Sequence, residues 1–189
     1  MAVMIHACCG PCLLYPASEL LRQKTDFTVY FYNPNIHPYQ EFRKRLNSFL
    51  DLCSSQNYNY LHDPDYGIND FLRSIIFREK SRCRLCYYMR LKSTAALAAE
   101  KNYDAFTTTL LYSKYQNHNL IKSLSEELAG LFSIPFLYFD FREGWDDGIE
   151  RSIHLGLYRQ KYCGCLFSEQ ERFDNRLKKR LKKEKQIDV

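Results

Sequence analysis

The stretch "AVMIHACCGPCLLYPASELLRQ", residues 2–23, predicts a strand, a tight loop and a helix in succession. Residues 2–7 are apolar and partly β-branched, which is typical of a buried strand. Gly10 and Pro11 interrupt this strand, and residues 13–23 then show the apolar spacing of an amphipathic helix. The loop between the two elements contains three cysteines. We therefore expect the fold and the chemistry of the chain to meet at this loop.

The remainder of the chain repeats this alternation of strand and helix. Short apolar or β-branched runs predict further strands over residues 27–34, 58–63, 103–111 and 134–141. Helical spacing lies between these runs, over residues 38–56, 71–76, 83–101 and 117–130. Strands that alternate with helices predict a parallel sheet, because parallel neighbours need crossover connections. We expect a single α/β domain over residues 1–189, with a doubly wound, mostly parallel five-stranded sheet, helices on both faces, and a C-terminal basic helix or tail over 168–189.

Polar, aromatic and thiol side chains follow three of the predicted strands. In a doubly wound sheet the first strand lies centrally, and ligands bind at the carboxyl ends of the strands where the strand order reverses. The cysteine loop follows strand one, "NPNIHP" (33–38) follows strand two, and "TTTLLYSKYQ" (107–116) follows strand four. The three loops are predicted to line one crevice.

The composition is typical of a globular protein of the cytoplasm. Hydrophobic residues make up 46% of the 189 residues and charged residues 26%. No apolar run is long enough to span a bilayer, and the first residues lack a signal-peptide pattern, so we expect a cytoplasmic protein with no membrane partner. In a reducing compartment the eight cysteines are expected to be buried thiols, catalytic thiols or metal ligands, and not a disulfide framework.

The net charge of +5 is concentrated near the C-terminus. Residues 176–185, "RLKKRLKKEK", contain seven Lys or Arg and one Glu. Such a run is either a solvated helix face or a contact for a polyanion, since each neutralised phosphate releases a counterion. The candidate RNA-binding residues in this run are Arg176, Lys178, Lys179, Arg180, Lys182, Lys183 and Lys185.

Seven of the eight cysteines form three clusters along the chain. The clusters are Cys8, Cys9 and Cys12; Cys83 and Cys86; and Cys163 and Cys165. Cys53 stands apart on the apolar stripe of a predicted helix and is assigned to the core. Two cysteines separated by two residues occur in zinc sites, iron–sulfur sites and dithiol enzymes alike. A structural zinc needs only four ligands, so the surplus of thiols favours an iron–sulfur cluster together with a further centre.

Six segments of the chain, in this order and at these separations, resemble one family. They are "HACCGPC" (6–12), "YNPNIHP" (32–38), "CRLCYYMR" (83–90), "TTTLLYSKYQ" (107–116), "DFRE" (140–143) and "GLYRQKYCGCLFS" (156–168). The combination resembles the epoxyqueuosine reductases of the QueH type. The resemblance implies a fold like that of the adenine-nucleotide α-hydrolase group, a [4Fe–4S] cluster with an adjacent mononuclear iron, and reduction of epoxyqueuosine to queuosine in tRNA.

The site residues are assigned on the basis of this resemblance. We expect Cys9, Cys83, Cys86 and Cys163 to bind the cluster, and Cys8, Cys12 and Cys165 to bind the second iron. We expect Asn33, Tyr112, Tyr115, Gln116, Arg159 and Gln160 to hold the modified base or its hydroxyls. Tyr158 and Tyr162 are candidates to stack on the base or to donate a proton. His6 is expected to be a hydrogen-bonded core residue, because thiolates are the preferred ligands for these metals.

The partners implied are a tRNA bearing epoxyqueuosine and an external electron donor such as ferredoxin or flavodoxin. Two other function classes stay open from the residues alone. One is a cytosolic dithiol oxidoreductase that acts through Cys9 and Cys12, and the other is a zinc-stabilised RNA-binding module without catalysis.

Overall fold

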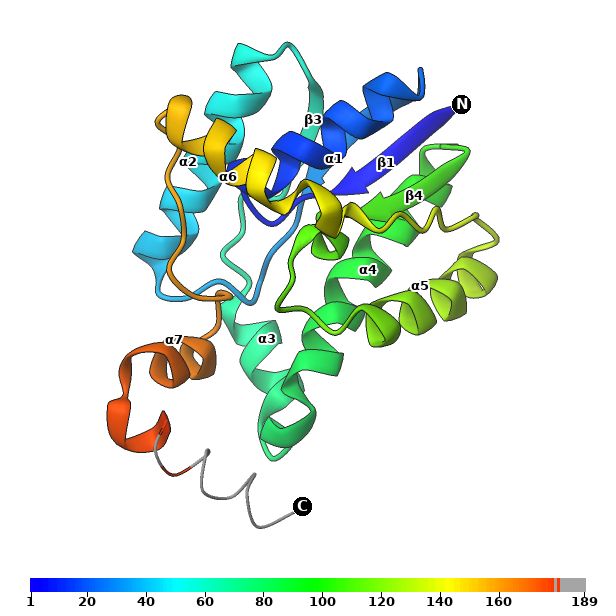
Figure 1. Cartoon of the computed structure of the whole chain (residues 1–189). Coiled ribbons are helices and arrows are strands. Elements are labelled where there is room, and N and C mark those ends of the chain that lie inside the picture. The colour runs from blue at the N-terminus through cyan, green and yellow to red at the C-terminus, as the bar shows by residue number, and fades with distance from the viewer. Residues whose placement is uncertain (179, 181–189) are drawn as a thin grey trace.

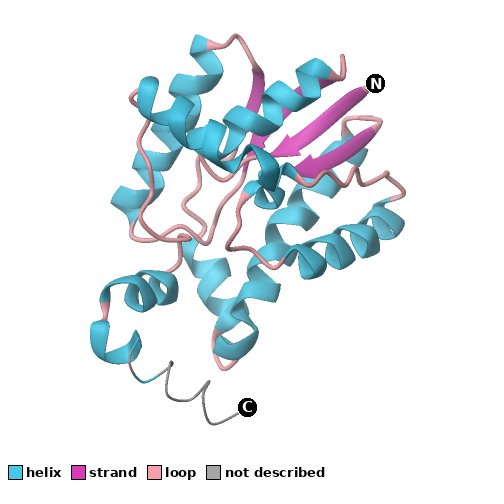
Figure 2. Cartoon of the chain, in the orientation of Figure 1, coloured by secondary structure: helices cyan, strands magenta, loops and turns pink. Residues whose placement is uncertain are grey.

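Four parallel strands form the sheet at the centre of the molecule (Figures 1 and 2). The computed structural model describes residues 1–178 and residue 180. The strands are β1 (Ala2–His6), β2 (Asp26–Phe31), β3 (Asn59–His62) and β4 (Ala105–Thr108). Their order is β3-β2-β1-β4 and every pairing is parallel. The predicted parallel α/β fold is confirmed, and the strand order reverses at β1.

Helices cover both faces of this sheet (Figure 2). They are α1 (Gly10–Arg22), α2 (Tyr39–Ser55), α3 (Ile68–Ile75), α4 (Arg82–Glu100), α5 (His118–Phe132), α6 (Trp145–His154) and α7 (Leu166–Phe173). Successive side chains of a strand point to opposite faces. Ile5 and Val29 accordingly pack in one apolar cluster with residues of α1 and α2, whereas Met4 and Phe106 pack in another with residues of α4 and α5.

Two predictions about single core residues are confirmed. Cys53 is fully buried in the apolar cluster on the α2 side of the sheet. His6 is also fully buried, and its ring nitrogens lie 3.0 Å from the Thr108 hydroxyl and 3.2 Å from the Tyr32 carbonyl. Burial lowers the pKa of His6 to about 4, so the ring is neutral in the folded protein.

The prediction of a fifth strand over residues 134–141 is wrong. Within the described residues this segment forms a single parallel bridge to β4, between Phe106 and Phe136. The carbonyl of Pro135 accepts the N–H of Phe106. Proline has no N–H of its own, so it cannot continue a ladder of hydrogen bonds.

β4 itself is too short to support a longer partner strand. The Thr107 hydroxyl donates to the Leu137 carbonyl at 2.8 Å. In a longer pairing this carbonyl would instead accept a backbone N–H of β4. The Thr108 hydroxyl then accepts the N–H of Leu110 and caps a 3-10 helix, Thr109–Tyr112. The chain therefore leaves the sheet after Thr108, and the sheet has four strands.

The basic C-terminal segment lies only partly within the described residues. Residues 175–178 are helical and follow α7 after Asp174. Arg176, Lys178 and Arg180 belong to the described part of the chain, whereas Lys179, Lys182, Lys183 and Lys185 lie outside it. No helix in the described ranges is long and apolar enough to cross a membrane.

Gly10 allows α1 to approach α2 closely at the cysteine loop. A Cβ atom at residue 10 would lie 2.4 Å from the carbonyl oxygen of Ser48. Because this neighbour is a backbone atom of α2, no change of rotamer would relieve the contact. The absence of a side chain at residue 10 therefore fixes the start of α1 against α2.

We expect Gly10→Ala to lower the free energy of unfolding by about 1–3 kcal/mol, the usual cost of overpacking a filled site. Chemical denaturation followed by far-ultraviolet circular dichroism measures this change. Gly130→Ala is the matched control, since nothing lies within 4 Å of a Cβ at residue 130 in α5 and alanine is the better helix former. An equal loss in both variants would contradict this account of Gly10.

Candidate metal centre and substrate pocket

Three thiols meet where β1 ends and α1 begins. The sulfur atoms of Cys8, Cys9 and Cys12 all lie within 4.8 Å of one another, and those of Cys8 and Cys9 are 3.8 Å apart. Two thiolates bound at 2.3 Å to one tetrahedral ion would be about 3.8 Å apart. Cys9 immediately precedes α1 and Cys12 lies in its first turn, so the positive end of the helix dipole faces the sulfurs. The spacing and the field both fit a group of thiolate ligands.

The pKa values of these three thiols are shifted in different directions. Hydrogen bonds from Cys12 and Cys9 hold the pKa of Cys8 well below its ordinary value, and the bond to Cys8 raises the pKa of Cys12. Burial raises the pKa of Cys9, which is fully enclosed. The backbone N–H of Cys8 donates to the Thr109 hydroxyl at 3.3 Å, which links the loop to the end of β4. Of the three thiols, Cys8 is the one whose pKa is lowered.

The other four clustered cysteines come from α4 and from the loop before α7. Cys83 and Cys86 lie in the first two turns of α4, and Cys163 and Cys165 flank Gly164. Cys86 and Cys165 share one apolar cluster. Burial raises the pKa of Cys86 to about 12, and the charges of the other three thiols act in the same direction. The cluster of Cys163 and Cys165 is thus close enough to raise the pKa of Cys86 in the other cluster.

Arg90 of α4 interacts with both groups of thiols. Its side chain is buried, and its Nη2 donates to the sulfur of Cys86 at 3.1 Å. The charge of Arg90 lowers the pKa of Cys8, where hydrogen bonds act more strongly in the same direction. At Cys86 the same charge lowers the pKa, whereas burial raises it. The guanidinium therefore provides positive charge to two sets of sulfurs that arise far apart in the sequence.

A pocket of about 720 Å³ opens beside the thiols. Cys8, Cys12 and Cys163 lie in its wall, together with residues of the segment after β4, of α6 and of the segment before α7. Its charged lining residues are Arg90, Arg159, Lys161, Glu171 and Arg172. The volume suits a ligand of nucleoside size, and the excess of basic side chains suits an anion.

Comparison with known proteins identifies the family. Residues 3–171 match the family described as epoxyqueuosine reductase QueH. The chain belongs to the QueH family. Epoxyqueuosine reductase QueH of Dehalococcoides mccartyi is 36% identical over 171 residues, which cover 90% of this chain and 94% of that protein. The QueH of Thermotoga maritima is 32% identical over 179 residues, with 90% and 91% of the two chains covered.

Among solved structures, the U34-tRNA thiolase NcsA from Methanococcus maripaludis, described with its [4Fe-4S] cluster, has a similar fold. The TM-score is 0.56 at 18% identity, and the match covers 91% of this chain and 64% of that chain. At this identity the likeness concerns the fold alone. It confirms the predicted adenine-nucleotide α-hydrolase-like architecture for this member of the QueH family.

Five of the six residues predicted to hold the substrate line the pocket in this QueH chain. They are Tyr112, Tyr115, Gln116, Arg159 and Gln160. The Nε2 atom of Gln116 donates to the sulfur of Cys163 at 3.4 Å, and that of Gln160 donates to the sulfur of Cys12, also at 3.4 Å. Asn33 lies outside the pocket wall and is buried, where its Nδ2 donates to the Ala7 carbonyl at 2.9 Å. Asn33 thereby ties the end of β2 to that of β1.

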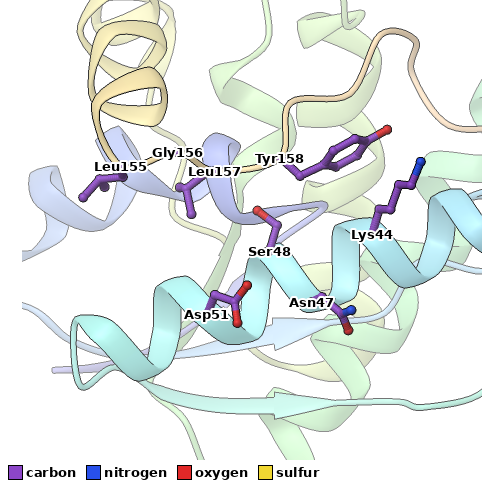
Figure 3. Close-up of a pocket in the computed structure, with 8 residues that line it drawn as sticks. All are labelled: Lys44, Asn47, Ser48, Asp51, Leu155, Gly156, Leu157 and Tyr158. Atoms are coloured by element: carbon purple, nitrogen blue, oxygen red, sulfur yellow. The ribbon is translucent and has the colours of Figure 1, made fainter.

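The two predicted proton donors lie in different places. Tyr158 lines a second pocket of about 370 Å³ between α2 and residues 155–158, where its ring lies beside Lys44 (Figure 3). Its hydroxyl donates to Glu41. Tyr162 lines the cysteine pocket, but its hydroxyl donates to the carbonyl of His37. The catalytic role of either tyrosine stays a prediction.

Arg45 of α2 fixes the loop that contains Cys163. Its Nε donates to Glu41 at 2.7 Å within a buried ion pair. Its Nη1 and Nη2 donate to the carbonyls of Cys163 and Tyr162, at 2.7 and 2.9 Å. Gly164 follows with a φ of +154°, a conformation that residues with a side chain rarely adopt. The planar guanidinium thus holds two successive carbonyls of the cysteine loop.

The sequence analysis did not identify Arg45, Arg90 or Trp145. Of these three residues, Arg90 and Trp145 line the pocket. A signal was present for both arginines. Arg45 follows Glu41 by four residues, and Arg90 follows Cys86 by four residues, which places each pair on one face of a helix. For Trp145, which begins α6, the sequence contained no comparable signal.

We expect Arg45→Met to lower the free energy of unfolding by about 3–5 kcal/mol, because it leaves the Glu41 carboxylate buried without its partner. Anaerobic chemical denaturation measures the loss. Arg43→Met is the matched control, since Arg43 is exposed on the same helix and surface changes usually stay within ±0.5 kcal/mol. Equal stability of the two variants would show that Arg45 does not anchor the loop.

Proposed function

We propose that this protein reduces the epoxide of epoxyqueuosine to give queuosine in tRNA, with thiol-bound iron as the redox centre. The observation that carries the proposal is the opening of Cys8 and Cys12 into a nucleoside-sized pocket whose wall also contains Cys163. Membership of the QueH family supports this reaction. Three of the proposed ligands and five of the proposed substrate residues line the same pocket, which supports the site. The proposed place of action is the cytoplasm, where cysteines stay reduced.

The reaction removes one oxygen atom and leaves an alkene. Both C–O bonds of the epoxide break, two electrons and two protons are consumed, and water departs. When bound, an iron–sulfur cluster and a neighbouring iron ion would supply single electrons and a Lewis acid for the epoxide oxygen. The electrons would come from an external donor such as ferredoxin or flavodoxin.

The donor set of the chain fits such a pair of centres. Three sulfurs lie within 4.8 Å of one another, and the charges of Cys83, Cys163 and Cys165 raise the pKa of the fourth further thiol, Cys86. The proposed ligands remain Cys9, Cys83, Cys86 and Cys163 for the cluster and Cys8, Cys12 and Cys165 for the second iron. The Cys8–Cys9 sulfur distance of 3.8 Å is compatible with ligands of one centre or of two adjacent ones, and single cysteine variants distinguish the two arrangements.

The chain's own side chains would bind and orient the nucleoside. Gln116 and Gln160 each lie against a cysteine sulfur, so a base bound between them would be held at the thiols. Tyr112 closes another part of the wall, and its hydroxyl is fixed by the Trp145 carbonyl at 2.9 Å. Arg159 is exposed in the wall and is placed to receive a phosphate or a hydroxyl of the substrate. These roles define the proposed substrate site.

The central test uses protein purified without oxygen, a chemical reductant, and an anticodon stem-loop RNA that carries epoxyqueuosine. We expect brown protein that contains iron and sulfide, and a product nucleoside lighter by one oxygen atom in mass spectrometry. Colourless protein that contains only zinc would overturn the redox mechanism. It would favour the zinc-stabilised RNA-binding module. Full activity without any metal would favour dithiol chemistry at Cys9 and Cys12.

Alanine variants of single cysteines test the ligand partition. We expect Cys83→Ala to lose sulfide and the broad visible absorption of the cluster, and Cys12→Ala to lose iron while it keeps sulfide. Cys53→Ala is the matched control, because Cys53 is a buried thiol in the core away from the pocket. Loss of sulfide in Cys12→Ala would instead place Cys12 on the cluster.

The basic C-terminal segment is proposed to bind phosphates of the tRNA. We expect the logarithm of the affinity to fall steeply with the logarithm of salt concentration, by about 0.7–0.9 per phosphate contact. Replacement of the seven basic residues of 176–185 by glutamine should flatten this slope at unchanged chain length. An unchanged slope in fluorescence anisotropy would show that the segment does not contact the RNA.

A further inference from the structure

Tyr115 and Trp145 form an aromatic pair at the pocket. The Tyr115 side chain is 86% exposed, although it lies in the pocket wall. Its ring packs edge-on against Trp145, with ring centroids 5.7 Å apart. Trp145 in turn stacks on the buried ring of Tyr112 at 5.2 Å. The exposed tyrosine is therefore the outermost member of an aromatic cluster that is anchored in the core by Tyr112.

The loop that carries Tyr115 is held in place by polar contacts. The N–H of Tyr115 donates to the Ser113 hydroxyl at 3.3 Å, and the N–H of Gln116 donates to the Ser113 carbonyl, also at 3.3 Å. The N–H of Asn117 donates to the Tyr87 hydroxyl at 3.3 Å. An exposed aromatic ring on an anchored loop loses little conformational entropy when a flat ligand stacks on it.

The surrounding charges favour a nucleotide as this ligand. The Nζ atom of Lys114 lies 5.8 Å from the Trp145 ring centroid, so a cation accompanies the aromatic pair. Arg159, Lys161 and Arg172 add exposed positive charge elsewhere in the pocket wall. Aromatic rings next to cations are the combination that binds single-stranded nucleic acid, by stacking on the bases and by attraction of the phosphates.

We propose that Tyr115, supported by Trp145, stacks on the base of a nucleotide adjacent to the modified one. The inference rests on the proposed function, because it takes the modified base to occupy the pocket beside the thiols. An anticodon loop presents unstacked bases that aromatic side chains can receive. A neighbour of the modified nucleotide would lie at the pocket opening, where the exposed ring of Tyr115 is available.

Binding of an anticodon stem-loop to the anaerobic holoprotein tests the proposal. Trp145 is the only tryptophan of the chain, so its fluorescence reports on this pair, and anisotropy of a labelled stem-loop gives the affinity. We expect RNA binding to change the Trp145 emission and Tyr115→Ala to raise the Kd by about 5- to 150-fold. Tyr115→Phe should bind like the wild type, because it keeps the ring.

Tyr138→Ala is the matched control. Tyr138 is 40% exposed, and its ring centroid lies 5.2 Å from the Nζ of Lys122, a contact like that of Lys114 with Trp145, but Tyr138 does not line the pocket. We expect this variant to bind the stem-loop with wild-type affinity. Equal affinities of wild type and Tyr115→Ala, or an unchanged Trp145 emission on RNA binding, would overturn the stacking proposal.

Stem-loops with an abasic residue on either side of the modified nucleotide identify the stacked base. The Tyr115→Ala penalty should vanish on one of these two RNAs, since the base that stacks is then missing. A penalty of equal size on all RNAs would contradict the assignment to a neighbouring base. Failure of the wild type to reduce a stem-loop that it binds would instead count against the proposed function.

Discussion

Two buried arginines impose the constraint on which the site depends. A guanidinium taken out of water is costly unless negative charge or hydrogen bonds compensate it. Arg45 has the Glu41 carboxylate and two backbone carbonyls. Arg90 forms no ion pair with a carboxylate in the described part of the chain, and its partners are the carbonyl and the sulfur of Cys86. Beyond this carbonyl and the Tyr87 ring, whose centroid lies 5.8 Å away, the compensation at Arg90 comes from sulfur.

The titration of Arg90 reflects this dependence. Burial lowers its pKa, but the thiols of Cys86, Cys163 and Cys8 raise it, and the net direction is upward. A set of thiolates would stabilise the buried cation, and the cation would stabilise the thiolates in return. Metal binding, which needs deprotonated sulfurs, and the burial of Arg90 are thus mutually supportive. Thiols from three segments of the chain thus raise the pKa of one arginine.

The elements with strong local patterns were predictable from the sequence. The β1 strand, the α1 helix and the cysteine loop follow from apolar runs broken by Gly10 and Pro11. The convergence of residues 107–116 with this loop follows from parallel topology, which places the carboxyl ends of β1 and β4 side by side. Three of the predicted substrate residues, Tyr112, Tyr115 and Gln116, line the pocket for this reason, because they lie on the segment that the topology brings to the cysteine loop.

Contacts between distant segments were not predictable. The fifth strand failed because Pro135 and the short β4 limit pairing. The proline was visible in the predicted run, whereas the early end of β4 was not. Asn33 was expected in the site because it follows β2, yet its amide binds the Ala7 carbonyl in the interior. Trp145 reaches the pocket only because α6 packs on α1. Such packing between helices far apart in sequence leaves no short-range pattern.

The geometry also separates this site from a dithiol enzyme that shares the letters Cys-Gly-Pro-Cys. Thiol–disulfide exchange needs an accessible thiolate that attacks a partner's sulfur. Here Cys9, the first cysteine of the motif, is fully buried and its pKa is raised. The thiol with the lowered pKa is Cys8, which precedes the motif. A metal centre has no need of an exposed Cys9, because it needs only sulfurs within bonding reach of one point. Cys8, the apparent extra residue in front of the motif, is the one that makes three such sulfurs available.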